Sequence, residues 1–447
     1  MERPLVGISL HSELEFLEHT ERVREHEAEI LEVTPETLWR PSDDPERGVR
    51  ENDYHAMFAE LKQRRGVPFI AHGVELSPGT ARDERGAVAR RTRQWLEQIR
   101  LDHACFDYLW YTEHMGWSAV DELHSALPLP LPFCAEAVSA CRRRLALLER
   151  IVPTVGFENS ANYVFMGDVA DEPAFFNAIA ADRYHVLLDL HNVHTECVNA
   201  GLDPFEYVER IDLSRVIEIH LAGGSQSEAA WLSSGATFRL DSHDGPVPET
   251  VWKLFEHVLP RCTGLRAVIV ERMTGTLDAE SAKDYADEFR RALAIVKASP
   301  VGSEPSAAAP VGSEPSAAAP VGSEPSPPRS ADLPADAPPL HAVQRAFMEI
   351  VTAPKAGPAL EKAREAHPEL AAALGPLAAD GLDLTALMVR KLRFERLLQG
   401  SKEAAFWFDE RPEEFAAVFG DYYGAVEPTA VFPSEEADLF ERWIAGR

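Results

Sequence analysis

The sequence lacks both a paired-cysteine framework and an excess of basic residues. Its 447 residues include five scattered cysteines and no CxxC pair. This usage is typical of a reducing compartment and argues against a disulfide scaffold or a zinc knuckle. The chain has 73 acidic and 44 basic residues, giving a formal net charge of -29. We therefore expect no nucleic-acid partner, because phosphate recognition depends on cationic side chains.

A long apolar segment is also missing. The N-terminus reaches the apolar stretch Leu5 to Ile8 almost at once, without a basic region before it. We expect neither a signal peptide nor a membrane span, and hence a cytoplasmic location. With 45% hydrophobic residues, the chain can bury a sizeable core, and its length suits one large domain and a smaller one.

Eight short apolar runs recur between residue 4 and about residue 272, separated by segments long enough for amphipathic helices. This alternation predicts an α/β fold with a parallel sheet, and eight is the strand number of a (β/α)8 TIM barrel. The runs are Pro4 to Leu10, Ala28 to Val33, Val67 to Ala71, Phe106 to Tyr111, Ile151 to Phe157, Tyr184 to Leu188, Arg215 to Ile219 and Arg266 to Val270.

Polar residues follow most of these runs, and they are densest after the sixth, where Asp189, His191, Asn192 and His194 lie within six positions. The carboxyl ends of barrel strands meet at one mouth, so we expect these residues to converge there. The strand-end residues are His11, Glu32 near Glu36, His72, Glu113, His114, Glu158, Asn159, Asp189, Glu218, His220 and Glu271, with Asp241 and His243 in a turn-rich loop after the seventh run.

Four imidazoles and four carboxylates dominate this set, which is more than one ion requires. Calcium or magnesium would recruit mainly oxygen ligands, and structural zinc would favour thiolates. A mixed nitrogen and oxygen set at an open mouth therefore indicates catalytic Fe, Mn or Zn in two or three sites. The alternative is a buried polar network without metal. The eight residues are His72, His114, His220, His243, Glu158, Asp189, Asp241 and Glu271.

Around these residues the sequence resembles the multinuclear non-heme iron oxidative enzymes, also called domain of unknown function 692. The resemblance covers roughly residues 4 to 295. Its most specific stretches are His-Gly-Val-Glu-Leu-Ser (72–77), Glu-His-Met-Gly-Trp (113–117), Glu-Asn-Ser-Ala-Asn-Tyr (158–163), Asp-Leu-His-Asn-Val (189–193), Glu-Ile-His-Leu-Ala-Gly (218–223) and Asp-Ser-His-Asp-Gly-Pro-Val-Pro (241–248).

The resemblance implies a barrel like those of xylose isomerase and apurinic endonuclease. It also implies oxidation of a ribosomally synthesised precursor peptide, commonly at cysteine, with two or three iron ions and O2, and a partner protein that presents the peptide. Carried over by position, the first iron would be held by His72, His114 and Glu158, the second by Asp189, His220 and Glu271 with Glu158 bridging, and the third by Asn192, Asp241 and His243.

An amide oxygen is a weaker ligand than a carboxylate or an imidazole, so the third site should be the loosest. Other mouth residues are candidates for orienting ligands or substrate, or equally for ordinary loop hydrogen bonds. These residues are His191, His194, Asn159, Asn162, Tyr163, Glu32 and Glu36.

The composition changes near residue 298, where Pro-Val-Gly-Ser-Glu-Pro-Ser-Ala-Ala-Ala begins at 300, repeats at 310 and starts again at 320. Such a segment cannot bury enough apolar surface to fold, so it predicts a disordered linker. The expected organisation is a metal-binding barrel (1–297), the linker (298–338) and a small helical domain (339–447). We expect helices at 340–351, 359–366, 384–398, 402–408, 412–419 and 435–444.

An aromatic cluster in the last domain is expected to form its core, with a peptide groove as the alternative. It comprises Phe406, Trp407, Phe408, Phe415, Phe419, Tyr422 and Tyr423. The domain weakly resembles the helical part of the family's partner proteins. We expect it to recruit peptide through the tether, or to form a homodimer.

Two other function classes remain at this point, a metal-dependent hydrolase or isomerase on the same barrel and a non-catalytic binding scaffold. The acidic composition disfavours an endonuclease-like hydrolase, which needs a basic cleft. Metal content separates the oxidative enzyme from the hydrolase or isomerase. Two or more irons indicate the oxidative enzyme, and zinc without O2 consumption indicates the hydrolase or isomerase.

Overall fold

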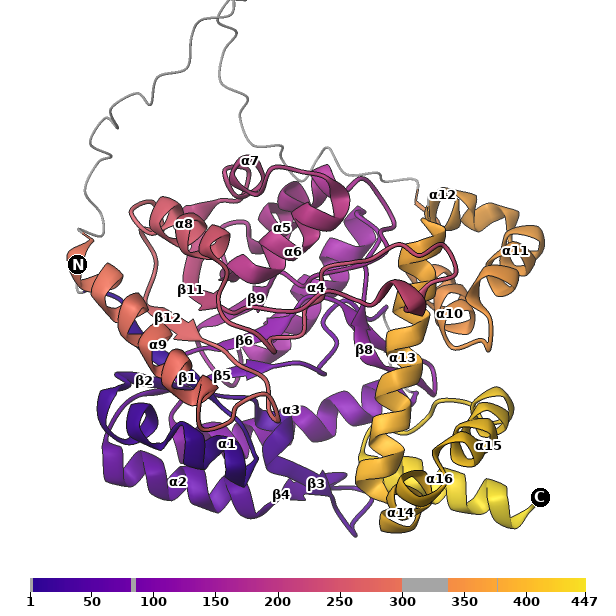
Figure 1. Cartoon of the computed structure of the whole chain (residues 1–447). Helices are drawn as coiled ribbons and strands as arrows, with labels where there is room; N and C mark the ends of the chain where they lie inside the picture. Colours follow the sequence, from indigo (N-terminus) through magenta and orange to yellow (C-terminus); the bar gives the residue numbers. More distant parts are fainter. Residues whose placement is uncertain (1–2, 82–85, 300–336, 376) are drawn as a thin grey trace, which may run out of the picture.

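A computed structural model describes residues 3–81, 86–299, 337–375 and 377–447. Its centre is a closed barrel of eight parallel strands in the order β1-β12-β11-β10-β9-β6-β5-β2, which confirms the predicted TIM barrel (Figure 1). The strands are β1 (Leu5–Leu10), β2 (Ile30–Val33), β5 (Phe69–Gly73), β6 (Tyr111–His114), β9 (Val155–Glu158), β10 (His185–Asp189), β11 (Val216–Leu221) and β12 (Ala267–Val270).

Seven of the eight predicted runs cover most or all of a barrel strand, and the fourth was misplaced. The strand lies at Tyr111–His114, whereas the run was placed at residues 106–111. Helix α3 (Ala87–Phe106) takes up the first residue of that run, because its buried face continues through Asp102 and Phe106. It stops where Asp107 adopts a left-handed backbone conformation, with φ of 48°.

Helices surround the barrel, and each buries one stripe of side chains against it. In α4 (Ala135–Leu148) the buried positions include Ala137, Cys141, Leu145 and Leu148, which recur at helical spacing. The other barrel helices are α1 (Leu14–His19), α2 (Asp53–Arg65), α5 (Glu172–Ala180), α6 (Leu190–Ala200), α7 (Pro204–Val208), α8 (Glu249–Val258) and α9 (Ser281–Ala298). Two hairpins extend from loops: β3 (Trp39–Pro41) with β4 (Val49–Glu51), and β7 (Trp117–Val120) with β8 (Leu123–Leu129).

The C-terminal helices, α10–α16, follow the repeat segment, whose residues 300–336 lie outside the described ranges. All six predicted helices are present, together with the short α12. Among the described residues no single helix is long and apolar enough to cross a bilayer. One bent pair of helical segments, Pro368–Leu374 with Ala379–Gly400, has the length and composition of a span, and nothing else supports it as one. The helices are α10 (Leu340–Val351), α11 (Ala356–Ala366), α12 (Ala371–Leu374), α13 (Ala379–Gly400), α14 (Lys402–Glu410), α15 (Pro412–Ala425) and α16 (Pro433–Ala445).

The predicted aromatic cluster does form a core between these helices, with one exception. Phe415, Phe419, Tyr422 and Tyr423 are buried together with residues of α16, while Trp407 and Phe408 pack at the edge. Phe406 was wrongly placed in this core, since 68% of its surface is exposed. Its position along α14 places the side chain on the solvent-exposed face of that helix.

The C-terminal helices pack directly on the barrel (Figure 1). Phe347 of α10 meets Trp117 of β7 edge to face, with ring centroids 6.3 Å apart. The buried Gln344 side chain donates to Gly79 O and accepts from Ala81 N, both at 2.8 Å. One hydrophobic core therefore runs from the barrel into α10 and α13 without a break.

Candidate metal centre

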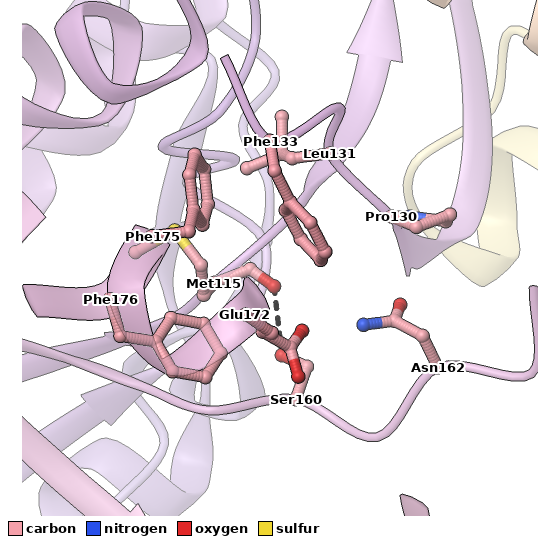
Figure 2. A pocket seen from close by; sticks show the side chains of 9 residues that line it. All are labelled: Met115, Pro130, Leu131, Phe133, Ser160, Asn162, Glu172, Phe175 and Phe176. Carbon is pink, nitrogen blue, oxygen red and sulfur yellow. Dashed lines mark hydrogen bonds between the residues drawn. The ribbon is translucent and has the colours of Figure 1, made fainter. Parts of the chain in front are cut away.

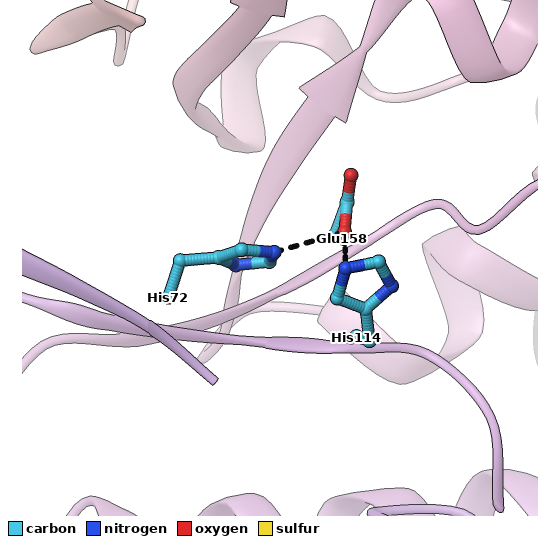
Figure 3. A group of neighbouring side chains, drawn as sticks. All are labelled: His72, His114 and Glu158. Atoms are coloured by element: carbon cyan, nitrogen blue, oxygen red, sulfur yellow. Dashed lines mark ion pairs between the residues drawn. The ribbon is translucent and has the colours of Figure 1, made fainter. Parts of the chain in front are cut away.

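Three predicted ligands meet at the ends of neighbouring strands, as Figure 3 shows. His72 is the penultimate residue of β5, His114 ends β6 and Glu158 ends β9, and the barrel order places these strands side by side. Glu158 Oε2 lies 3.1 Å from His72 Nε2 and 2.9 Å from His114 Nε2. Although burial raises the pKa of the Glu158 carboxyl, the two imidazoles lower it overall, so the group is a carboxylate.

Both histidines of this first group are held from behind by hydroxyl groups. Thr112 Oγ1 lies 3.0 Å from His72 Nδ1, and Ser160 Oγ lies 3.4 Å from His114 Nδ1. A hydrogen bond at Nδ1 orients the ring and leaves Nε2 to face Glu158. The pairing of adjacent strands thus positions the ligands, and Thr112 of β6 and Ser160 of the loop after β9 orient them.

A second group lies beside the first, around Asp189, His220 and Glu271. His220 Nδ1 is 3.0 Å from Glu271 Oε2 and 4.0 Å from Asp189 Oδ2. Glu158, Asp189 and His220 also lie within ligand distance of one another, as do Asp189, His243 and Glu271. Burial raises the pKa of Asp189 to about 7. Asp189 and Glu158 each belong to two groups, which is the arrangement that bridging carboxylates require.

The third group contains Asp241 and His243, 2.7 Å apart, from the loop after β11. His243 has a left-handed backbone with φ of 47°, an uncommon conformation for a residue with a side chain that is often stored at functional sites. Asn192 donates from Nδ2 to Glu158 Oε1 and to Asn159 O, while its buried Oδ1 makes no hydrogen bond within the described residues. The amide oxygen is therefore the atom left to ligate.

His191 was predicted to orient ligands or substrate, but it lies close enough to Asp241 and His243 to act as a ligand itself. Its Nδ1 is 3.9 Å from Asp241 Oδ1 and has no hydrogen-bond partner among the described residues. Burial, with His243 nearby, lowers the pKa of His191, so the ring is neutral and able to ligate. The third group consequently offers four donors, His191, Asn192, Asp241 and His243.

Behind His220 lies a pair of buried carboxylates. Glu32 Oε2 is 3.1 Å from His220 Nε2, and Glu218 Oε1 is 3.5 Å from the same atom. Ser9 donates to Glu32, and Trp110 donates to Glu218 from Nε1. Glu218 was expected at the mouth but not among the ligands or orienting residues, although its i, i+2 spacing to His220 on a strand places both on the same face.

The remaining predicted residues support the loops or line the mouth. Asn159 exchanges two hydrogen bonds with the backbone of Asp189, and Tyr163 Oη accepts from Asp241 N. Glu36 accepts from the backbone of Val74 and Glu75. Asn162 borders two cavities, and His194 joins none of the donor groups among the described residues.

The donor set fits metal ions for two reasons. Six carboxylates and five imidazoles occur in these groups, and buried carboxylates are stabilised by bound cations. Several of their buried atoms also make no hydrogen bond within the described part of the chain, although they lie close to one another. These atoms are Glu158 Oε2, Asp189 Oδ2, His191 Nδ1, Asn192 Oδ1, Glu218 Oε1, His220 Nδ1, Asp241 Oδ1 and His243 Nε2.

A family model described as "RiPP precursor modification enzyme MbnB/TglH/ChrH" matches residues 5–296. The chain belongs to this family. RiPP stands for ribosomally synthesised and post-translationally modified peptide, so members are enzymes that act on a peptide. The matched segment includes every donor residue of the three groups, from His72 to Glu271, and ends before the C-terminal helices.

Relatives with sequence similarity match about half or more of the chain. A UPF0276 protein of Caulobacter vibrioides is 32% identical over 212 residues, covering 47% of this chain and 70% of the relative. A UPF0276 protein of Bordetella pertussis is 31% identical over 276 residues, covering 60% and 88%. Among solved structures, the xylose isomerase domain protein from Planctomyces limnophilus is 12% identical with a TM-score of 0.44, covering 66% of this chain and 98% of that one.

Replacing Glu32 by glutamine tests the support behind His220. Because the carboxylate that accepts from His220 Nε2 is lost, metal affinity should fall by about ten- to a hundredfold. Competition with a chelator measures the change. Glu29→Gln, directly before β2 and paired with Arg3, is the matched control and should retain full affinity. Equal affinities of both variants would remove the positioning role of Glu32.

Proposed function

We propose that the chain uses two or three iron ions and O2 to oxidise a ribosomally synthesised precursor peptide, and that the oxidised residue is a cysteine. The observation that supports this most directly is the set of three adjoining donor groups that share Glu158 and Asp189. Imidazole and carboxylate ligands suit iron, and shared carboxylates hold ions at bridging distance. When bound, iron would supply the one-electron and O2 chemistry that no side chain can perform.

The protein's own residues would prepare this chemistry. His72, His114 and Glu158 would hold the first ion, and Asp189, His220 and Glu271 the second, with Glu158 between them. Asp241 and His243, with Asn192, would hold the third. Buried side chains behind them would fix the ligand orientations and exclude water.

The reacting thiol would come from the peptide. None of the five cysteines of the chain belongs to a donor group, and four of them are buried. The most solvent-accessible donors are Asp241, His114 and Glu271, with side chains 20%, 19% and 15% exposed, whereas Asp189 and His220 are fully buried. A peptide would therefore approach from the side of Asp241.

Metal analysis and O2 uptake test the proposal together. The chain is purified without oxygen and its iron and zinc are measured. It is then mixed with the precursor peptide encoded by a short reading frame beside its gene. At least two irons per chain, O2 consumption that depends on the peptide, and a mass change at a cysteine are expected. Zinc alone, with neither O2 uptake nor a mass change, would contradict the proposal.

Asp241→Ala is expected to empty the third site while the other two stay filled. Asp241 is the only carboxylate of that group, and amide and imidazole ligands alone bind iron more weakly. Iron content should fall by about one ion per chain, as measured by Mössbauer spectroscopy during iron titration. Asp244→Ala on the same loop is the control and should retain all ions. Uniform loss from every site in Asp241→Ala would show that the sites are not separate.

A further inference from the structure

A cavity of about 60 Å³ lies beside Asp241, between the barrel mouth and helix α13. Pro128 and Pro130 form one wall, Asn162 and Tyr163 another, and Thr385 of α13 closes it. Pro130 and Asn162 also border a second, smaller cavity of about 10 Å³, where Figure 2 shows the Asn162 amide directed inward. The C-terminal helices thus contribute directly to the surroundings of the candidate metal centre.

The position of α13 is fixed by close packing. Gly381 lies against the carbonyl oxygen of Tyr163 so closely that a Cβ atom at this position would collide with it. One turn further on, Leu384 packs in a cluster with Leu232 and Leu240 from the loop after β11. Near its other end, Arg396 forms an ion pair of 2.7 Å with Glu75 in the loop after β5. Three barrel loops therefore hold Thr385 in place.

The walls of the cavity define the kind of group that it accepts. Prolines and the Thr385 methyl group are apolar, and Thr385 Oγ1 is already occupied by a hydrogen bond to Gly381 O at 2.8 Å. Tyr163 Oη accepts from Asp241 N at 3.1 Å, which ties this wall to the third donor group. The volume has room for a few water molecules or for a small aliphatic side chain. A charged or aromatic side chain would not fit.

We propose that this cavity is a specificity pocket of the peptide substrate, in which α13 forms the wall that selects a small uncharged side chain next to the reacting residue. The proposal rests on the proposed function, because it assumes a peptide at the metal centre. Asp241 connects the two, since it both belongs to the third donor group and lines the cavity. The C-terminal helices are then part of the substrate site.

The probe is a set of acetylated and amidated pentapeptides, Gly-Xaa-Cys-Xaa-Gly, in which both flanking residues are Gly, Ala, Val, Leu or Trp. Binding to the full-length, metal-loaded chain is measured by calorimetry without O2. The wild type should prefer Ala or Val over Trp by at least about tenfold, as expected when a pocket discriminates by size. Thr385→Leu fills the cavity and should shift the preference to Gly, with about tenfold weaker binding of the Val peptide.

The control is Asp383→Leu, which places the same side chain on the exposed face of α13 two positions away and should keep the wild-type ranking. Thr385→Ala enlarges the cavity and should improve binding of the Leu peptide. A wild-type ranking in both Thr385 variants would show that the cavity holds only water, and would overturn the pocket while leaving the proposed function intact. A wild-type chain that binds no peptide of the set and modifies no precursor would overturn both.

Discussion

Glu158→Gln is expected to lower the iron content of two sites together and to abolish turnover. Glu158 lies within ligand distance of the first group and of the second, so an amide at this position removes a charged oxygen from both. The fold should persist, because the substitution preserves shape and an amide oxygen at the Oε1 position still accepts the hydrogen bond from Asn192. Iron analysis, peptide turnover and circular dichroism together measure the outcome.

The matched control is Glu172→Gln. Glu172 is equally buried, accepts a hydrogen bond from Tyr207 and lies outside the donor groups. Burial raises the pKa of Glu172, so glutamine resembles its protonated form and full iron content should be retained. If Glu158→Gln kept all its iron and its O2-coupled activity, the ligand assignment would be wrong.

The barrel and its donor groups were predictable because both depend on short-range sequence patterns. An apolar run followed by a polar residue marks the carboxyl end of a buried strand, and closure of the barrel brings such ends together. His72, Glu158 and Asp189 were found in this way. The fourth run failed because Phe106 is equally apolar whether it ends a helix or begins a strand, and periodicity does not separate the two over so few residues.

Other features depend on contacts between distant segments. Nothing in the local sequence distinguishes His191 from His194, yet the helix geometry of α6 directs the first toward Asp241, while His194 joins no donor group within the described residues. Likewise, no local signal in α13 marks Thr385 as a neighbour of Asp241. The repeat segment suggested a loosely tethered domain, whereas the packing of Phe347 on Trp117 is visible only when both segments are placed in space.

Removing residues 337–447 is expected to destabilise the barrel. The tether hypothesis predicts instead that the truncated chain stays stable and only needs more peptide. Truncation would expose Trp117, which Phe347 covers, and would leave the polar groups of Gly79 and Ala81 without Gln344. Losing even two such buried contacts, at about 3 kcal/mol each, should lower the melting temperature by about 10 °C or more. Differential scanning calorimetry and soluble yield measure the loss.

Cutting the chain without removing anything separates packing from tethering. A protease site introduced between residues 300 and 336 allows cleavage of the folded protein. If the shared core holds the C-terminal helices on the barrel, both fragments should elute together at the mass of the uncut chain, with unchanged iron content and an unchanged peptide concentration for half-maximal rate. The tethered arrangement would be established instead if the fragments separated and the barrel stayed stable. The peptide concentration for half-maximal rate would then rise by about ten- to a hundredfold, as expected for a lost tether.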